Sequence, residues 1–168
     1  MDHDTPDFTT EPFRGSNHAP LDPDTEADIV VIGAGPAGLA VAACLKQRGH
    51  SPLVIDRAQE VASSWRRHYE RLHLHTVKTH SALPGLPFAA DAPRYVPRQG
   101  VVDYLTRYAD RYGIEPELGE TVLGIEPAAP GAGWLTRTAS GRLIASRQVV
   151  VATGANRRPR APALPGQD

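Results

Sequence analysis

Apolar runs separated by glycine and proline predict a strand, a helix and a second strand in the first third of the chain. Residues 28–32 (DIVVI) form a short continuous apolar run, which is typical of a parallel strand with both faces buried. A glycine-rich turn follows, and residues 52–55 (PLVI) predict a second buried strand that ends at Asp56. We expect the intervening helix to end near Gly49. The order strand, helix, strand predicts a βαβ unit with a right-handed crossover. The apolar residues at helical spacing in this helix are Ala37, Ala40, Val41, Cys44 and Leu45.

The remaining pattern predicts a second helix and a β section. Residues 71–78 (RLHLHTVK) alternate like an extended strand, and prolines between positions 84 and 97 mark a long loop. Residues 97–112 predict a helix that stops at Gly113. Its apolar face consists of Val101, Leu105, Tyr108 and Tyr112. From residue 117 onward the chain predicts four strands, TVLGIE, WLTRT, RLIAS and RQVVVATG, with a turn at positions 140–141.

Charge divides the chain into an acidic start and a basic remainder. Residues 1–26 are polar and contain prolines, and we expect them to form a disordered tail before a single domain at 27–168. Residues 1–28 carry eight of the 19 acidic residues, which leaves 17 bases against 11 acids in the rest. This positive excess suits an anionic ligand, although a solvated basic surface would look the same. The bases are scattered and do not alternate with aromatic residues, which argues against nucleic-acid binding.

Several classes of protein are disfavoured by what the sequence lacks. No apolar run reaches 18 residues, so we expect no membrane-spanning helix, and the acidic N-terminus does not resemble a secretory signal. One cysteine, Cys44, cannot form an internal disulfide, which suits a cytoplasmic protein. Four histidines between positions 68 and 80 match no established zinc spacing, so no metal site is predicted.

The turn VIGAGPAGLA carries the strongest candidate chemistry. It has the form GxGxxG, in which Gly33 permits a tight turn, Gly35 lets the main chain approach a diphosphate, and Gly38 allows close helix–strand packing. The helix N-terminus then offers free N–H groups and a partial positive charge. Asp56 follows Gly38 by 18 residues, where a carboxylate can bind ribose hydroxyls and repel a 2′-phosphate. These features disfavour NADP and leave NAD or FAD.

Four stretches of the chain resemble the flavin-containing monooxygenase family, especially its bacterial and plant YUCCA-like branch. They are GAGPAGLAVAACLKQRGHSPLVIDRA, SSWRRHYERLHLHTVKTHSALPGLPF, PRYVPRQGVVDYLTRYADRYGIE and QVVVATGANRRPRAPALPG. Their order and spacing match the FAD-binding half of such enzymes over residues 28–166. The resemblance implies an α/β, Rossmann-type FAD-binding domain with a parallel sheet, a small antiparallel β section and FAD at the first glycine turn.

The resemblance also implies roles for individual residues. Asp56 would bind the ribose, with Arg57 beside the adenine and ribose. Trp65 would lie near the diphosphate and the ribityl chain, with Arg66 next to it. Family members often carry two glycines near that tryptophan, whereas this chain has serines at positions 63–64.

Further contacts are implied along the rest of the chain. Residues 74–78 would pass the isoalloxazine ring, the main chain of Val122 would contact adenine, and the ATG signature at 152–154 would return to the cofactor. The complete set of implied cofactor contacts is Gly33, Gly35, Pro36, Ala37, Gly38, Asp56, Arg57, Trp65, Arg66, Leu74, His75, Thr76, Lys78, Val122, Ala152, Thr153 and Gly154.

In this family a second GxGxxG binds NADPH after the ATG signature, and the chain stops at Asp168 before any such motif. We therefore expect an FAD domain that is incomplete at its C-terminus. A complete enzyme would use NADPH, FAD and molecular oxygen to oxygenate a small organic substrate through a flavin hydroperoxide. Two alternatives remain: a non-catalytic FAD-binding module or truncated fragment, and part of another two-dinucleotide flavoprotein reductase.

Overall fold

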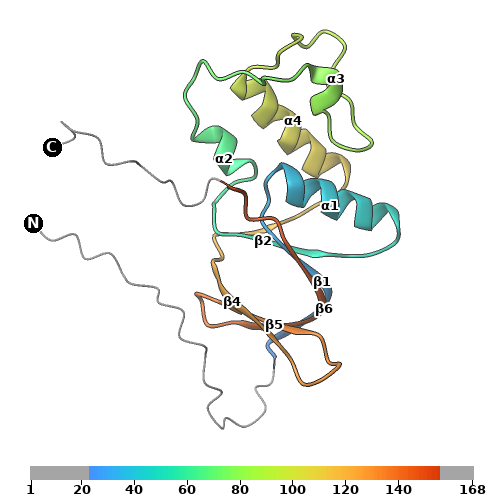
Figure 1. Cartoon of the computed structure of the whole chain (residues 1–168), viewed down its shortest axis with the longest axis vertical. Helices are drawn as coiled ribbons and strands as arrows, with labels where there is room; N and C mark the ends of the chain where they lie inside the picture. Colours follow the sequence, from blue (N-terminus) through green and yellow to red (C-terminus); the bar gives the residue numbers. More distant parts are fainter. Residues whose placement is uncertain (1–22, 156–168) are drawn as a thin grey trace, which may run out of the picture.

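The computed structural model describes residues 23–155, in which six strands form one sheet in the order β3-β2-β1-β6-β5-β4 (Figure 1). The predicted tail lies largely outside the described residues, although its last two positions, Thr25 and Glu26, begin β1. The elements in chain order are β1 Thr25–Ile32, α1 Pro36–Gln47, β2 Leu53–Asp56, α2 Ser63–Arg66, α3 Lys78–Ser81, α4 Arg98–Arg111, β3 Glu117–Leu118, β4 Val122–Pro127, β5 Trp134–Thr138 and β6 Leu143–Val151.

The predicted βαβ unit is confirmed, and it lies at the centre of the parallel half of the sheet. β1 pairs in parallel with both β2 and β6, and Val31 aligns with Val54 on one side and Val150 on the other. β2 also pairs in parallel with β3. β1, β2 and β6 therefore end side by side, with the glycine turn, Asp56 and the ATG signature at the same edge of the sheet.

The other half of the sheet is antiparallel, as expected, but it contains one strand fewer than predicted. The stretches RLIAS and RQVVVATG are one strand, β6, and not two. Residues 143–146 of β6 pair with β5, and β6 continues along β1 as far as Val151. Because no glycine or proline interrupts positions 143–151, the chain has no reason to turn there.

Both faces of β1 are buried over residues 29–32, and β2 is buried at residues 54–55, which accounts for their continuous apolar runs. Ile29, Val31 and Val54 face the helices α1 and α4 in the larger core. Val30 and Ile55 face the opposite side, in a smaller core with Ile32 and Ile144. Successive residues of β1 thus alternate between two cores.

Helix α1 buries a different face from the predicted one. Its buried residues are Gly38, Leu39, Ala42 and Ala43, whereas Cys44 is half-buried and Ala37 is exposed. Residues 39–45 (LAVAACL) are apolar on every side, so spacing alone does not select a face. The choice is made by Gly38, where an added Cβ would collide with the main-chain oxygen of Gly33.

Helix α4 confirms the predicted second helix and holds the loop that precedes it. Its buried face includes Val101, Leu105 and Tyr108. The Tyr104 hydroxyl donates to the carbonyl of Leu86 at 2.6 Å, and the Tyr108 hydroxyl donates to the carbonyl of Pro84 at 2.8 Å. Two tyrosines of α4 therefore anchor the proline-rich segment that sequence alone identified only as a loop.

The strand predicted at 71–78 is absent. A single β-bridge joins His73 to Pro97, and Lys78 begins the short helix α3. An alternating pattern of apolar and polar residues forms a strand only where another strand is available for pairing. Most side chains of residues 71–78 are solvent-exposed or only half-buried. Among the described residues no helix is long and apolar enough to cross a membrane.

Candidate functional site

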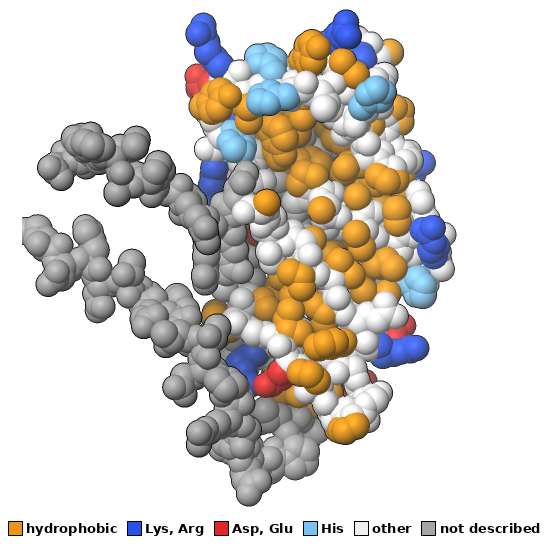
Figure 2. Space-filling view, viewed as in Figure 1, with side chains coloured by type: hydrophobic (Ala, Val, Ile, Leu, Met, Phe, Trp, Pro, Cys, Tyr) orange, Lys and Arg blue, Asp and Glu red, His pale blue; other side chains and the backbone are white. Residues whose placement is uncertain are grey.

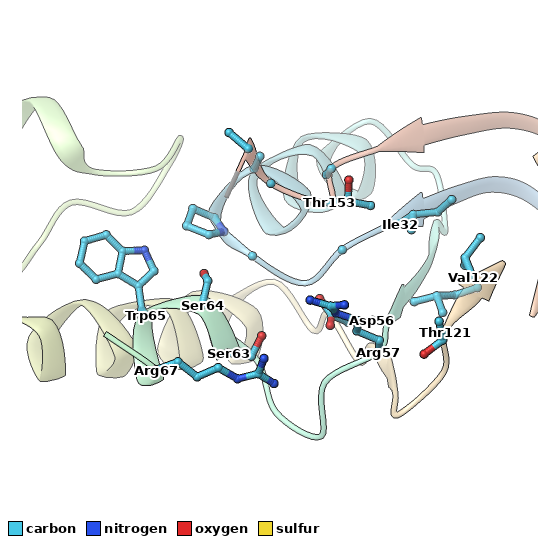
Figure 3. A pocket seen from close by; sticks show the side chains of 18 of the residues that line it. Ile32, Asp56, Arg57, Ser63, Ser64, Trp65, Arg67, Thr121, Val122 and Thr153 are labelled. Atoms are coloured by element: carbon cyan, nitrogen blue, oxygen red, sulfur yellow. The ribbon is translucent and has the colours of Figure 1, made fainter. Parts of the chain in front are cut away.

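A cleft of about 520 Å³ opens at the carboxyl ends of β1, β2 and β6. In α/β sheets this edge is the usual place for a ligand. Figure 3 shows the cleft extending from Trp65 on α2, past Asp56, to Thr121 and Val122 at the start of β4. Its length suits an extended ligand. The lining residues are Ile32, Gly33, Gly35, Pro36, Ala37, Ile55, Asp56, Arg57, Ser63, Ser64, Trp65, Arg67, His68, Glu120, Thr121, Val122, Ala152, Thr153, Gly154 and Ala155.

The three glycines of the turn are needed for different reasons. Gly33 has a φ of 117°, and a Cβ there would overlap the main-chain oxygen of Ala152. Gly38 packs in the same way against Gly33. A Cβ on Gly35, in contrast, would meet no atom of the described residues within 4 Å beyond its own chain neighbours and helix. Packing within the protein therefore accounts for two glycines, and only the open cleft accounts for Gly35.

The N-terminus of α1 points its unpaired N–H groups at this open space. Gly35 is the N-cap residue, no side chain caps the helix, and its first turn contains no acid. The first N–H groups of a helix lack partners within the helix and carry partial positive charge. The turn thus fits the diphosphate of a dinucleotide, which would supply the missing acceptors and the negative charge.

Asp56 ties the turn to the end of β2. One carboxylate oxygen accepts a hydrogen bond from the main-chain N–H of Ala34 at 2.6 Å, and the other accepts from Ala58 at 2.8 Å. Since each carboxylate oxygen has a second lone pair, Asp56 can also accept from ribose hydroxyls. The anchoring of Ala34 was not predicted from the sequence, because nothing in a spacing of 18 residues specifies a main-chain partner.

Two arginines line the cleft without a partner. Among the described residues, neither the Arg57 nor the Arg67 guanidinium makes a hydrogen bond or an ion pair. Arg66 behaves differently, because its Nε donates to the carbonyl of Val61 at 3.0 Å and lies 3.3 Å from Glu60. The family resemblance implied Arg66, whereas the structure places its neighbour Arg67 on the cleft wall.

Aromatic and acidic groups occupy opposite ends of the cleft. At one end Trp65 meets His68 edge-on, with 5.9 Å between ring centroids. At the other end Glu120 accepts a hydrogen bond from the Ser140 hydroxyl at 2.7 Å. This hydrogen bond lowers the pKa of Glu120, so its carboxylate is held in the charged form.

The structure brings most of the predicted site residues together. Those that line the cleft are Gly33, Gly35, Pro36, Ala37, Asp56, Arg57, Trp65, Val122, Ala152, Thr153 and Gly154. Gly38 is buried behind the turn, and Arg66 faces away. Six further residues line the cleft that were not predicted from the sequence: Ser63, Ser64, Arg67, His68, Glu120 and Thr121. The first four lie within three residues of Trp65, and this closeness was the only signal for them in the sequence.

The residues expected beside the isoalloxazine ring lie outside the cleft. Lys78 donates to the carbonyls of Ala89, Ala90 and Ala92 at 3.1, 2.7 and 2.6 Å, which uses all three of its N–H donors. Thr76 forms a hydrogen bond with the Ser81 hydroxyl. Leu74 and His75 do not line the cleft. In the described part of the chain, no three His, Cys, Asp or Glu side chains lie close enough to hold a metal.

Comparisons with known proteins identify relatives of this chain. Indole-3-pyruvate monooxygenase YUCCA1 of Oryza sativa subsp. japonica is 43% identical over 138 residues, covering 82% of this chain and 34% of the relative. YUCCA6 of Arabidopsis thaliana is 41% identical, covering 83% of this chain and 34% of the relative. The chain thus spans about a third of the length of these curated relatives. The predicted resemblance to flavin-containing monooxygenases is confirmed.

Solved structures show the same architecture. A flavin monooxygenase from Stenotrophomonas maltophilia, a double mutant, superposes with a TM-score of 0.77 at 27% identity, covering 85% of this chain and 42% of that one. A bacillithiol disulfide reductase from Staphylococcus aureus gives a TM-score of 0.71 at 19% identity, covering 77% and 39%, and shows the fold alone. The family model for pyridine nucleotide-disulphide oxidoreductase matches residues 30–168. The chain therefore belongs to the pyridine nucleotide-disulphide oxidoreductase family.

Proposed function

We propose that the cleft binds FAD and that this chain is the FAD-binding part of an NAD(P)H-dependent flavin monooxygenase. The observation that carries the proposal is the open space at Gly35, where a glycine is unexplained by protein packing at the uncapped start of a helix. The YUCCA relatives, at 41–43% identity, favour a monooxygenase over a disulfide reductase, whose structural likeness stands at 19–22% identity.

We assign each part of FAD to a part of the cleft. The diphosphate would lie over Gly35 and the start of α1, and the ribose would lie against Asp56. The adenine would reach toward Val122, whereas the ribityl chain would pass Trp65. When bound, FAD would supply the redox centre that accepts hydride from NADPH and reacts with molecular oxygen, so that a small organic substrate is oxygenated.

Titration of the purified chain with FAD tests the proposal. We expect quenching of flavin fluorescence, a visible flavin spectrum that remains with the protein after gel filtration, and a higher Tm as ligand is added. Circular dichroism of the same sample reports whether the chain is folded. A folded chain that remains colourless and does not gain stability with FAD would rule the proposal out.

Oxygen consumption separates the enzyme from its alternatives. Because NADPH is expected to bind beyond the cleft described here, we expect FAD binding by this chain without NADPH-dependent oxygen uptake. Oxygen uptake by a longer protein that includes this sequence would support the monooxygenase. FAD binding with no turnover in that longer protein would favour a non-catalytic module, and NADPH-dependent disulfide reduction would favour a reductase.

A further inference from the structure

We infer that the α2 wall of the cleft is a second phosphate-binding element, in which the Arg67 guanidinium and the hydroxyls of Ser63 and Ser64 bind the diphosphate opposite the glycine turn. The inference rests on the proposed FAD binding and assigns residues that sequence reasoning did not select. In this arrangement the side chains of α2 and of Arg67, which follows it, would bind one side of the diphosphate, and the main-chain N–H groups of α1 would bind the other.

The direction of the side chains supports this assignment. Figure 3 shows Ser63, Ser64 and Trp65 extending from α2 into the cleft toward the glycine turn, with Arg67 along the same wall below Ser63. Among the described residues, the side chains of Ser63, Ser64 and Arg67 have no hydrogen-bonding partner of their own. Their donors are therefore available to a ligand.

The α2 wall is held at a set position relative to the turn. Ala62, the N-cap residue of α2, donates its main-chain N–H to the carbonyl of Ala34 within the turn, at 3.3 Å. On the other side Arg98 of α4 donates to the carbonyls of Arg66 and His68, at 3.1 and 2.8 Å. These contacts join the two walls before any ligand arrives, which lowers the ordering cost of binding.

Charge also favours a phosphate at this wall. The carboxylate of Asp56 already accepts two main-chain N–H groups, and Glu120 lies at the far end with Thr121 and Val122, so neither pairs with Arg67. Lysine, arginine and histidine side chains gather at the end of the molecule formed by α2 and α3 (Figure 2). An arginine presents several N–H donors that fit phosphate oxygens, and it keeps its charge at every physiological pH.

The neighbouring arginines provide matched controls. Arg66 is unsuitable for a phosphate because Val61 and Glu60 already hold its guanidinium. Arg71 lies in the same segment and carries the same charge, but it does not line the cleft. Arg67→Met and Arg71→Met therefore remove the same charge from the chain, and only the first removes it from the proposed site.

The test compares dissociation constants for FAD, ADP and riboflavin in the full chain and its variants, at low and high salt. We expect Arg67→Met to weaken FAD and ADP binding about tenfold and to reduce the salt dependence of both. Riboflavin, which has no phosphate, should bind the variant and the original chain equally. Arg67→Lys should recover part of the loss, and Arg71→Met should leave all three constants unchanged.

A double variant, Ser63→Ala with Ser64→Ala, gives an independent reading because it keeps every charge. It should weaken FAD and ADP binding while the salt dependence stays the same. If the original chain binds FAD and both the Arg67→Met and the double-serine variants, folded by circular dichroism, bind it equally well, the α2 inference is overturned and the proposed function stands. If the original chain binds neither FAD nor ADP, the proposed function and this inference both fail.

Discussion

The glycine turn and residues 74–78 were both expected to contact the cofactor, yet they are built in opposite ways. The turn presents main-chain groups, and its contacts with Ala152 leave no space for side chains. Residues 74–78 would contact the cofactor through side chains, but the side chains of Lys78 and Thr76 form their hydrogen bonds within the protein itself. The motif therefore predicts which main-chain groups face the cleft, whereas no sequence pattern predicts which acceptors the side chains of Lys78 and Thr76 bind.

The reason lies in what each contact requires. A glycine motif specifies a backbone shape, and that shape directs N–H groups at a ligand wherever the motif folds correctly. A lysine has a long, flexible stem and can bind any acceptor within reach. The segment at 89–92 offers Lys78 three carbonyls, which no local sequence pattern specifies.

The largest expected effect comes from Gly33→Ala. The new Cβ would overlap the Ala152 carbonyl, and a φ of 117° is strained for any residue with a side chain. We expect a loss of about 2–4 kcal/mol in the free energy of unfolding, measured by urea denaturation. An unchanged free energy of unfolding would show that the glycine turn can move away from Ala152 to accept a side chain. The turn would then not differ from residues 74–78 in this respect.

Gly35→Ala should separate binding from folding. Its φ of −84° suits alanine, and in the described part of the chain no residue apart from its neighbours and its own helix lies within 4 Å of the new Cβ. We expect a stability change below about 1 kcal/mol, because alanine is only a poorer N-cap residue. FAD affinity should fall at least about tenfold, since the methyl group would occupy the space of the diphosphate. A large loss of stability with intact FAD binding would contradict this reading.

Lys78→Met tests the other side of the comparison. Removing three hydrogen bonds from a partly exposed ammonium should cost about 1–2 kcal/mol in the free energy of unfolding. FAD affinity and the visible spectrum of the bound flavin should remain those of the original chain, because Lys78 does not line the cleft. A shifted flavin spectrum would instead place Lys78 beside the ring, as the family resemblance implies.

The smallest effect is expected at high pH and concerns Tyr108, which holds Pro84 in the proline-rich segment. Burial raises the pKa of Tyr108 from its ordinary value of 10.0 to about 12. The folded state therefore keeps the phenolic proton more tightly, and the resulting stability is present below pH 10 and is lost as the pH rises toward 12. Burial also raises the pKa of Tyr104, so ultraviolet absorbance should show a late phenolate titration whose amplitude falls by one tyrosine in Tyr108→Phe. A Tyr108→Phe titration identical to the original would contradict the assignment.

Apolar patterns in the sequence predicted some elements of the fold correctly and others wrongly. The continuous apolar runs located β1 and β2, because both strands are buried on two faces. The same kind of pattern failed for α1, which is apolar on all sides and whose buried face depends on Gly38 meeting Gly33. Alternation at 71–78 likewise predicted a strand, which the fold does not provide with a full pairing partner.

The sequence by itself determined the βαβ unit, the glycine turn and the acid that follows it, because neighbouring residues specify these features through backbone geometry and apolar spacing. Only the tertiary structure decided which arginine after Trp65 faces the cleft and where Lys78 finds its acceptors. The first outcome depends on the hydrogen bond from Ala62 to Ala34 and on the contacts of Arg98, and the second on where the chain places the carbonyls of residues 89–92. Side-chain direction is set by such long-range packing, so it became visible only once the chain was folded.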